Sequence, residues 1–151
     1  MQNSEIILRL SLAIIFGMII GAERLFVHKE AGMKTHALVA LGAAVFVLVS
    51  EAMVEKYIDL PGLNPTMIAS QIIVGIGFLG AGTIMHQGSR PLGLTTAGGL
   101  WVTAGIGMAV GFGLYSLSVI ATVLILLILL AMNILEKPIR KISDEIEQPE
   151  S

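Results

Sequence analysis

Long apolar runs separated by short polar segments fill most of the sequence. From these runs we predict five helices, at residues 6–22, 37–53, 65–85, 95–111 and 116–135. A segment in the bilayer must satisfy its own backbone hydrogen bonds, and a helix of about 20 apolar residues crosses the hydrocarbon core. The pattern therefore indicates an all-α membrane protein, a bundle of five transmembrane helices.

Glycine is concentrated in the third and fourth apolar runs, which we expect at the centre of the bundle. Twelve of the 17 glycines lie between Gln71 and Tyr115, a stretch without Asp or Glu. In a bilayer, small residues let neighbouring helices approach closely. We expect these two helices to pack together across a tight turn at residues 86–93. Helix-packing surfaces are expected at Gly17, Gly21, Gly75, Gly77, Gly80, Gly82, Gly107 and Gly111.

Capping and breaking residues suggest where the helices begin and end. We expect Thr35 to cap the second helix, and the pair Asn64-Pro65 to start the third. Pro138 is expected to end the fifth, which leaves a transmembrane domain at residues 1–136 and a short cytoplasmic tail at 137–151. The fifth helix has no glycine and no polar residue expected to function, so we place it on the lipid-facing side.

The overall composition supports membrane insertion and narrows the function. Hydrophobic residues make up 55% of the chain and charged residues 13%, against about a quarter in soluble domains. The absence of cysteine excludes disulfides and thiolate chemistry. Neither a basic nucleic-acid surface nor a nucleophile–base pair, phosphate loop or zinc pattern is present, so we expect neither nucleic-acid binding nor enzyme activity, and no cofactor.

Lysine and arginine are distributed unequally between the two ends of the predicted helices. Seven of the nine fall on one side: Arg24, Lys29, Lys34, Arg90, Lys137, Arg140 and Lys141. Only Arg9 and Lys56 fall on the other. Cytoplasmic loops carry the excess of positive charge. We therefore predict that the N-terminus lies outside and the C-terminus in the cytoplasm.

Four sequence motifs resemble those of the MgtC/SapB family: GMIIGAER (17–24), AGMKTHALVALGAA (31–44), QIIVGIGFLGAGTI (71–84) and GLTTAGGLWVTAGIGMAVGFGLY (93–115). The resemblance implies a bacterial inner-membrane protein linked to magnesium limitation, in a short form without the soluble C-terminal domain of many members. It also implies the F-type ATP synthase as a membrane partner of some relatives. The family is often associated with magnesium transport.

Polar residues around the first loop are the first group of candidates for function. Glu23 and Arg24 either form a helix-end ion pair or contact a partner, and Glu23 is the acid closest to the bilayer in the motifs. Lys34 and His36 either anchor the helix at the membrane surface or sense anionic lipid or pH. Thr35 is the expected cap.

A second group of polar candidates lies in the third and fourth helices. Gln71 either bonds across helices or lines a polar cavity. Thr95 and Thr96 either cap the fourth helix or hold an anion at its N-terminus. Thr103 can bond its own preceding turn, and Trp101 is expected to find a buried partner for its N–H.

Two functions remain open from the sequence, besides a purely structural role. The first is contact with membrane partners or lipid under low magnesium. The second is transport of Mg²⁺ or another solute, which normally requires oxygen ligands such as carboxylates; a metal site is left unassigned. The glycine surfaces also suggest a homodimer or other homo-oligomer, through the first or the fourth helix.

Overall fold

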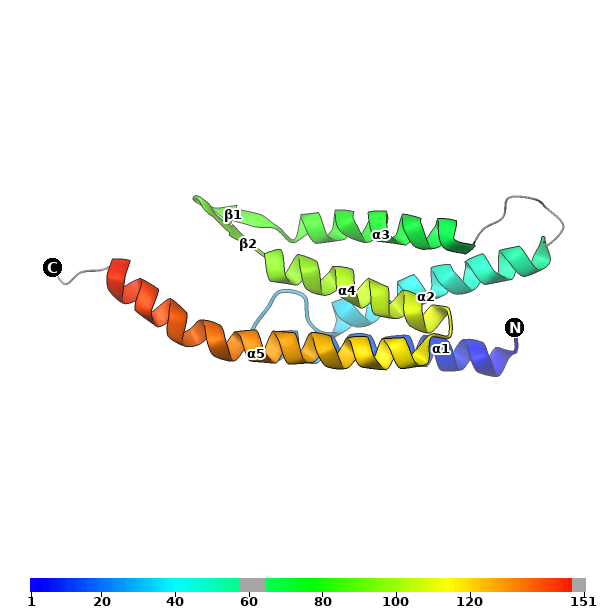
Figure 1. The fold of residues 1–151 in the computed structure, drawn as a ribbon. Coiled ribbons are helices and arrows are strands. Elements are labelled where there is room, and N and C mark those ends of the chain that lie inside the picture. Colours follow the sequence, from blue (N-terminus) through cyan, green and yellow to red (C-terminus); the bar gives the residue numbers. More distant parts are fainter. Residues whose placement is uncertain (58–64, 148–151) are drawn as a thin grey trace.

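Five helices run side by side along one direction in the computed structural model, which describes residues 1–57 and 65–147 (Figure 1). They are α1 (Asn3–Phe26), α2 (Met33–Lys56), α3 (Pro65–Gly82), α4 (Leu94–Gly111) and α5 (Tyr115–Glu147). A two-stranded hairpin, β1 (Met85–Gln87) and β2 (Arg90–Leu92), joins α3 to α4. The all-α fold with five helices is confirmed.

Most of these helices are long and apolar enough to cross a membrane. Four meet that requirement: α1, α2, α4 and the part of α5 at Tyr115–Glu136. The apolar part of α3, Met67–Gly82, is shorter. Eighteen residues of α3 amount to about 27 Å of helix, close to the thickness of the hydrocarbon core. The chain is a membrane protein.

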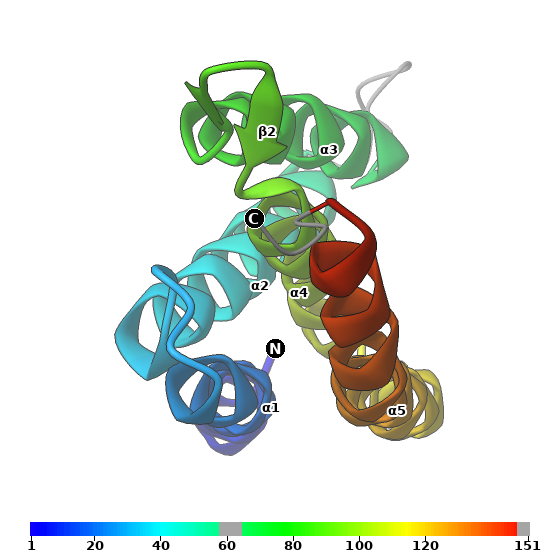
Figure 2. The same ribbon diagram turned by 90° about the vertical axis from the view of Figure 1, so that its left-hand side faces the viewer.

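The centre of the bundle is α4, whereas α3 lies at its outside (Figure 2). Helix α4 contacts α1, α2, α3 and α5, and more than half of its span is buried. Of the described side chains and glycines of α3, only Ile76 and Gly80 are buried. The expected central position is therefore found for α4 but not for α3.

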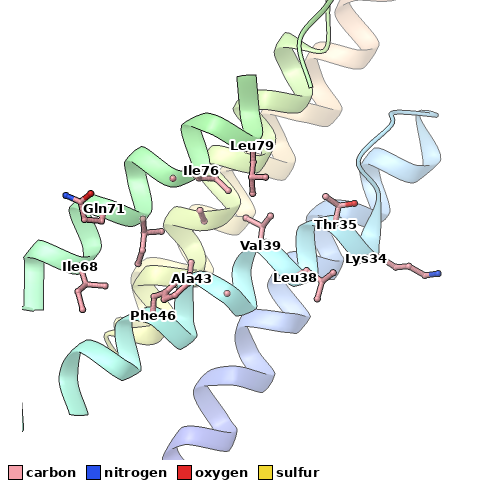
Figure 3. A pocket seen from close by; sticks show the side chains of 14 residues that line it. Lys34, Thr35, Leu38, Val39, Ala43, Phe46, Ile68, Gln71, Ile76 and Leu79 are labelled. Atoms are coloured by element: carbon pink, nitrogen blue, oxygen red, sulfur yellow. The ribbon is translucent and has the colours of Figure 1, made fainter. Parts of the chain in front are cut away.

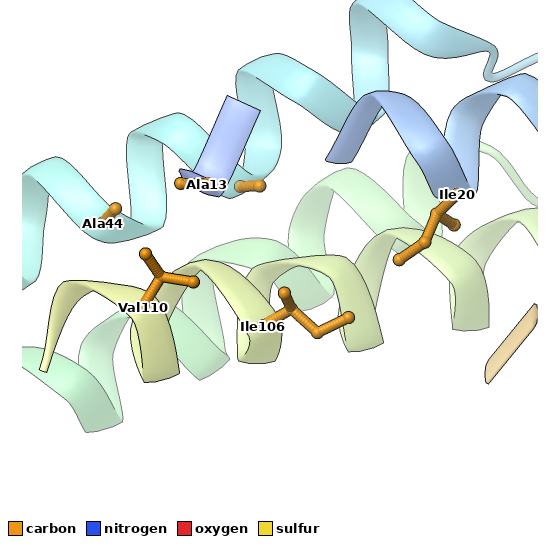
Figure 4. Close-up of a cluster of buried hydrophobic side chains, with 6 residues drawn as sticks. Ala13, Ile20, Ala44, Ile106 and Val110 are labelled. Atoms are coloured by element: carbon orange, nitrogen blue, oxygen red, sulfur yellow. The ribbon is translucent and has the colours of Figure 1, made fainter. Parts of the chain in front are cut away.

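Small and branched apolar side chains form the core between α1, α2 and α4 (Figure 4). Ala13 and Ile20 of α1 meet Ala44 of α2 and Ile106 and Val110 of α4. Alanine at the positions where the three helices meet lets their backbones approach closely. The resulting dispersion contacts favour helix association in lipid, where the hydrophobic effect does not drive it.

The connection between α3 and α4 is longer than the predicted turn at residues 86–93, and it contains the two-stranded hairpin. Helix α3 ends at Gly82 and not near residue 85, and the Thr83 hydroxyl donates to Gly80 O at 2.8 Å. His86 pairs with Pro91 across the antiparallel hairpin. Gly93 then starts α4 with φ 86°, a left-handed conformation that favours glycine, and a Cβ there would collide with the Thr83 carbonyl oxygen.

Three further predictions about helix ends are wrong. The N-cap of α2 is Gly32, and Thr35 lies within the first turn. The N-cap of α4 is Gly93, so Thr95 and Thr96 occupy its first turn. Helix α5 continues past Pro138 to Glu147, and its C-terminal part curves and extends beyond the other helices (Figure 1). The expected cap Asn64 lies outside the described residues.

Helix α5 is largely lipid-facing, as predicted, with about a tenth of its span buried. It is not without polar contacts, however. Ser118 and Thr122 are buried. Ser118 Oγ donates to the carbonyl oxygen of Leu114, just before the helix, at 3.0 Å, and Thr122 Oγ1 donates to Ser118 O at 2.7 Å. Asn133 reaches across to α1, which the sequence did not indicate.

Candidate functional site

A buried ion pair lies where α1 ends. Arg24 and Glu23 are 1% and 6% exposed. Arg24 Nε donates to Glu23 Oε2 at 2.5 Å, and Arg24 Nη2 donates to Glu23 Oε1 at 2.8 Å. This two-pronged geometry matches the planar guanidinium to the carboxylate. The predicted ion pair of neighbouring residues exists, but it points into the bundle and not into the loop.

Asn133 of α5 completes this ion-pair cluster from a position 110 residues away in sequence. Its amide Nδ2 donates to Glu23 Oε1 at 2.6 Å. The only available signal was a single amide within the apolar run of α5. Such a residue in a membrane helix faces protein or a polar cavity, so its partner could have been sought but not named.

His36 and Thr103 form a second buried pair, between α2 and α4. Thr103 Oγ1 donates its proton to Gly99 O at 2.7 Å, so it accepts from His36 Nδ1 at 2.8 Å. A Cβ at Gly99 would lie 3.4 Å from His36 Cε1, which shows how closely the ring approaches the bare α4 backbone. Both side chains are fully buried.

These two pairs leave a donor and an acceptor without partners among the described residues. Arg24 Nη1 and His36 Nε2 are buried and make no hydrogen bond there. Burial of an unpartnered polar group is unfavourable by about 1–3 kcal/mol. The two pairs therefore retain hydrogen-bonding capacity at these atoms, whereas the charges of Glu23 and Arg24 neutralise each other.

A second ion cluster, which the sequence reasoning missed, lies toward the opposite end of α1. Arg9 pairs with Glu5 one turn earlier, and Arg9 Nη1 donates to Glu51 Oε2 of α2 at 2.8 Å and to Gly111 O of α4 at 2.6 Å. A cation at the C-terminus of α4 complements the helix dipole. Glu51 lies inside a predicted span, so acids near the bilayer are not limited to Glu23.

Some of the predicted packing glycines lie in close helix contacts. A Cβ added at Gly17 would lie 2.6 Å from His36 O, and one added at Gly21 would lie 2.5 Å from Met33 Cα. A Cβ added at Gly111 would lie 2.8 Å from Val47 Cβ. At Gly107 it would collide with Ala40 O, whereas at Gly80 it would meet Ala97 at an ordinary 3.6 Å. The prediction is wrong within this chain for three positions, where a Cβ has no described neighbour within 4 Å: Gly75, Gly77 and Gly82.

The other polar candidates lie outside the two buried pairs, and most of them are exposed. Thr96 is buried, and Thr95 is exposed. Trp101 is 51% exposed, so the expectation of a buried partner for it is wrong. The remaining candidates are exposed beside a groove between α2 and α3: Lys34, Thr35 and Gln71.

The chemistry of the buried clusters favours structure over reaction. Among the described residues no three His, Asp or Glu side chains gather as metal ligands. Thr103 and His36 lie at the distance of a nucleophile and its base, but both are fully buried and the hydroxyl proton goes to Gly99 O. That geometry ties α2 to α4 and does not activate the hydroxyl.

Comparison with known proteins identifies the family. The sequence model of the MgtC family matches residues 10–138. The protein named "Putative magnesium transporter YhiD" of Escherichia coli K12 is 44% identical over 130 residues, which cover 85% of this chain and 60% of the relative. Protein MgtC of Salmonella typhimurium LT2 is 48% identical over 120 residues, which cover 80% of this chain and 49% of the relative. Protein MgtC of Brucella abortus is 43% identical over 127 residues, which cover 84% of this chain and 49% of the relative.

This chain thus spans about half to three-fifths of the length of these curated relatives. No solved structure matches it. The matched region includes α2, α3, α4 and most of α1, with both buried polar pairs. On this evidence, the chain belongs to the MgtC family.

Proposed function

We propose that this protein acts in magnesium homeostasis, or in adaptation to low magnesium, through contacts with other components of the bacterial inner membrane. The observation that carries the proposal is that Glu23 and Glu51, two acids close to the bilayer, are each bound by an arginine of α1. Arg24 holds Glu23, and Arg9 holds Glu51. A carboxylate occupied by an arginine is a poor ligand for a passing cation.

The outer face of α3 is the surface that fits such a contact. Val74, Gly77, Phe78 and Ala81 follow the spacing of one helix face, and all four are exposed. Phe78 is 81% exposed, and a Cβ at Gly77 would have no described neighbour within 4 Å. A bare backbone beside large apolar side chains suits close packing of another transmembrane helix.

The partner is a membrane protein, with the F-type ATP synthase as the candidate that the family resemblance suggests. A second copy of this chain is the other candidate. The predicted dimer contacts on the first and fourth helices are less suitable, because Gly17 and Gly107 already lie against α2 within one chain. The orientation that we propose places the N-terminus outside and the C-terminus in the cytoplasm.

Transport of Mg²⁺ is the second candidate function, favoured by the name of the Escherichia coli relative. The two candidates separate in sealed vesicles that contain the purified chain and a Mg²⁺-sensitive dye. We expect a flat dye signal with an imposed Mg²⁺ gradient. A protein-dependent rise that disappears in Glu51→Gln would establish the transporter instead.

The partner contact is tested by cross-linking in native membranes under low magnesium. Gly77→Leu should reduce the cross-linked product at least severalfold, because the new side chain blocks the outer face of α3 without meeting the rest of the fold. The matched control is Gly75→Leu on the opposite face of α3, which also has open space. Equal products from both variants and the wild type would reject this surface.

A further inference from the structure

An apolar groove of about 650 Å³ lies between α2 and α3 (Figure 3). Leu38 and Phe46 of α2 and Leu79 of α3 line its walls, and Ala104 of α4 contributes to its lining. This groove is separate from the outer face of α3. Gly75 and Leu79 line the groove, whereas Val74 and Phe78 do not and lie about 100° away from them around the helix.

A lysine stands at one end of this groove. Lys34 is exposed, lines the groove together with Thr35, and has no ion-pair partner among the described residues. A second hollow, between α1 and the start of α2, is also lined by Lys34, Thr35 and Leu38. The second hollow is also lined by Glu30, and the two hollows meet at Lys34, whereas the α2–α3 groove has Lys34 as the charged residue of its lining. The N-cap of α2 beside it, Gly32, has no side chain to occupy the first backbone N–H groups.

The length of the groove agrees with one leaflet of a bilayer. From Lys34 to Phe46, α2 rises about 18 Å at 1.5 Å per residue. Half of a hydrocarbon core of about 30 Å is about 15 Å. A lipid chain whose headgroup lies at Lys34 would thus end near Phe46. Gln71, about 16 Å along α3 from Gly82, lies at that same depth.

Two glycines line the groove from opposite helices and leave space in it. A Cβ at Gly42 of α2 or at Gly75 of α3 would have no described neighbour within 4 Å, and both residues line the groove. Larger side chains at these positions would fill the space without disturbing the fold. This property allows a clean test.

We propose that the α2–α3 groove binds one acyl chain of an anionic phospholipid, whose phosphate pairs with Lys34. The lysine supplies the charge complementarity, the apolar walls take the chain, and the groove has the depth of the leaflet on the side of Lys34. Neither the proposed partner contact nor magnesium is needed for this binding, so the two proposals can fail independently.

Native mass spectrometry of the purified full chain, titrated with phosphatidylglycerol or with phosphatidylcholine of the same acyl chains, tests the headgroup contact. We expect phosphatidylglycerol to bind about fivefold more tightly, the factor for about 1 kcal/mol per lysine near a charged membrane surface. Lys34→Gln should abolish this preference. Lys29→Gln should retain it, because Lys29 is exposed in the loop before α2 and does not line the groove. A preference that survives Lys34→Gln overturns the proposal.

The chain contact is tested with Gly42→Leu, which should reduce binding of both lipids severalfold. The control Gly77→Leu, on the outer face of α3, should bind both as the wild type does. Unchanged melting temperatures for the two variants exclude misfolding as the cause. The proposal is wrong if Gly42→Leu leaves lipid binding intact. If this variant leaves lipid binding intact but splits a dimer, the occupant of the groove is a second copy of this chain.

Discussion

Glu23 and Arg24 gain their importance from burial, which proximity in sequence did not reveal. An exposed ion pair contributes about 0–1 kcal/mol, whereas removal of one partner of a buried pair costs about 3–5 kcal/mol. Because Arg24 is only 1% exposed, the larger cost of breaking a buried pair applies. The amide of Asn133 donates a further hydrogen bond to the Glu23 carboxylate and so joins α5 to α1.

The first prediction concerns this pair. Arg24→Met should destabilise the folded bundle by about 3–5 kcal/mol, because it leaves the Glu23 carboxylate buried without its cation. Glu23→Gln added to Arg24→Met should recover a large part of that loss, since the neutral amide needs no counter-charge. Unfolding in detergent, followed by circular dichroism, measures both. A double variant less stable than Arg24→Met would contradict the ion-pair account.

At the scale of helices, contact between α2 and α4 depends on glycine at particular positions. Gly107 lies against the carbonyl of Ala40, whereas Gly105, two residues earlier on the same helix, has open space. Both glycines belong to one apolar run, and sequence periodicity alone does not separate them. The His36–Thr103 hydrogen bond joins the same two helices.

The second prediction compares these two glycines directly. Gly107→Ala should lower the stability of the bundle by about 1–3 kcal/mol, since the added methyl group forces α2 and α4 apart. Gly105→Ala should leave the melting temperature unchanged, because its methyl group meets no described atom within 4 Å. Similar melting temperatures for the two variants would show that the α2–α4 contact is looser than described.

At the scale of the whole molecule, the proposed orientation in the membrane rests on charge and on connectivity together. Helices that alternate in direction place the α3–α4 hairpin on the same side as the first loop, which carries most of the basic residues of the N-terminal half. With the positive-inside preference, this placement supports the orientation that we propose, in which that side faces the cytoplasm.

The third prediction tests this orientation, and the absence of native cysteine makes it direct. A membrane-impermeant maleimide applied to spheroplasts should label Lys56→Cys and not Ser89→Cys, while permeabilised membranes should show both. These positions are exposed, at the end of α2 and in the hairpin. Labelling of Ser89→Cys from outside would reverse the proposed topology.

The sequence by itself determined the membrane insertion, the five helices and the family motifs. Each rests on local properties: apolar length, glycine content and residue spacing. It also singled out Glu23, Arg24, His36 and Thr103 as polar residues in apolar surroundings. Their burial followed only from the tertiary structure, because it depends on which helix face meets which neighbour.

Only the tertiary structure decided the contacts between distant residues and the fate of each glycine. Asn133 meets Glu23, and Arg9 meets both Glu51 and Gly111, across separations of 110, 42 and 102 residues. No local pattern encodes such pairings. In a bilayer, every helix is apolar on most faces, so the hydrophobic pattern cannot tell a face that packs from one that meets lipid; the steric fit of neighbouring backbones makes that distinction.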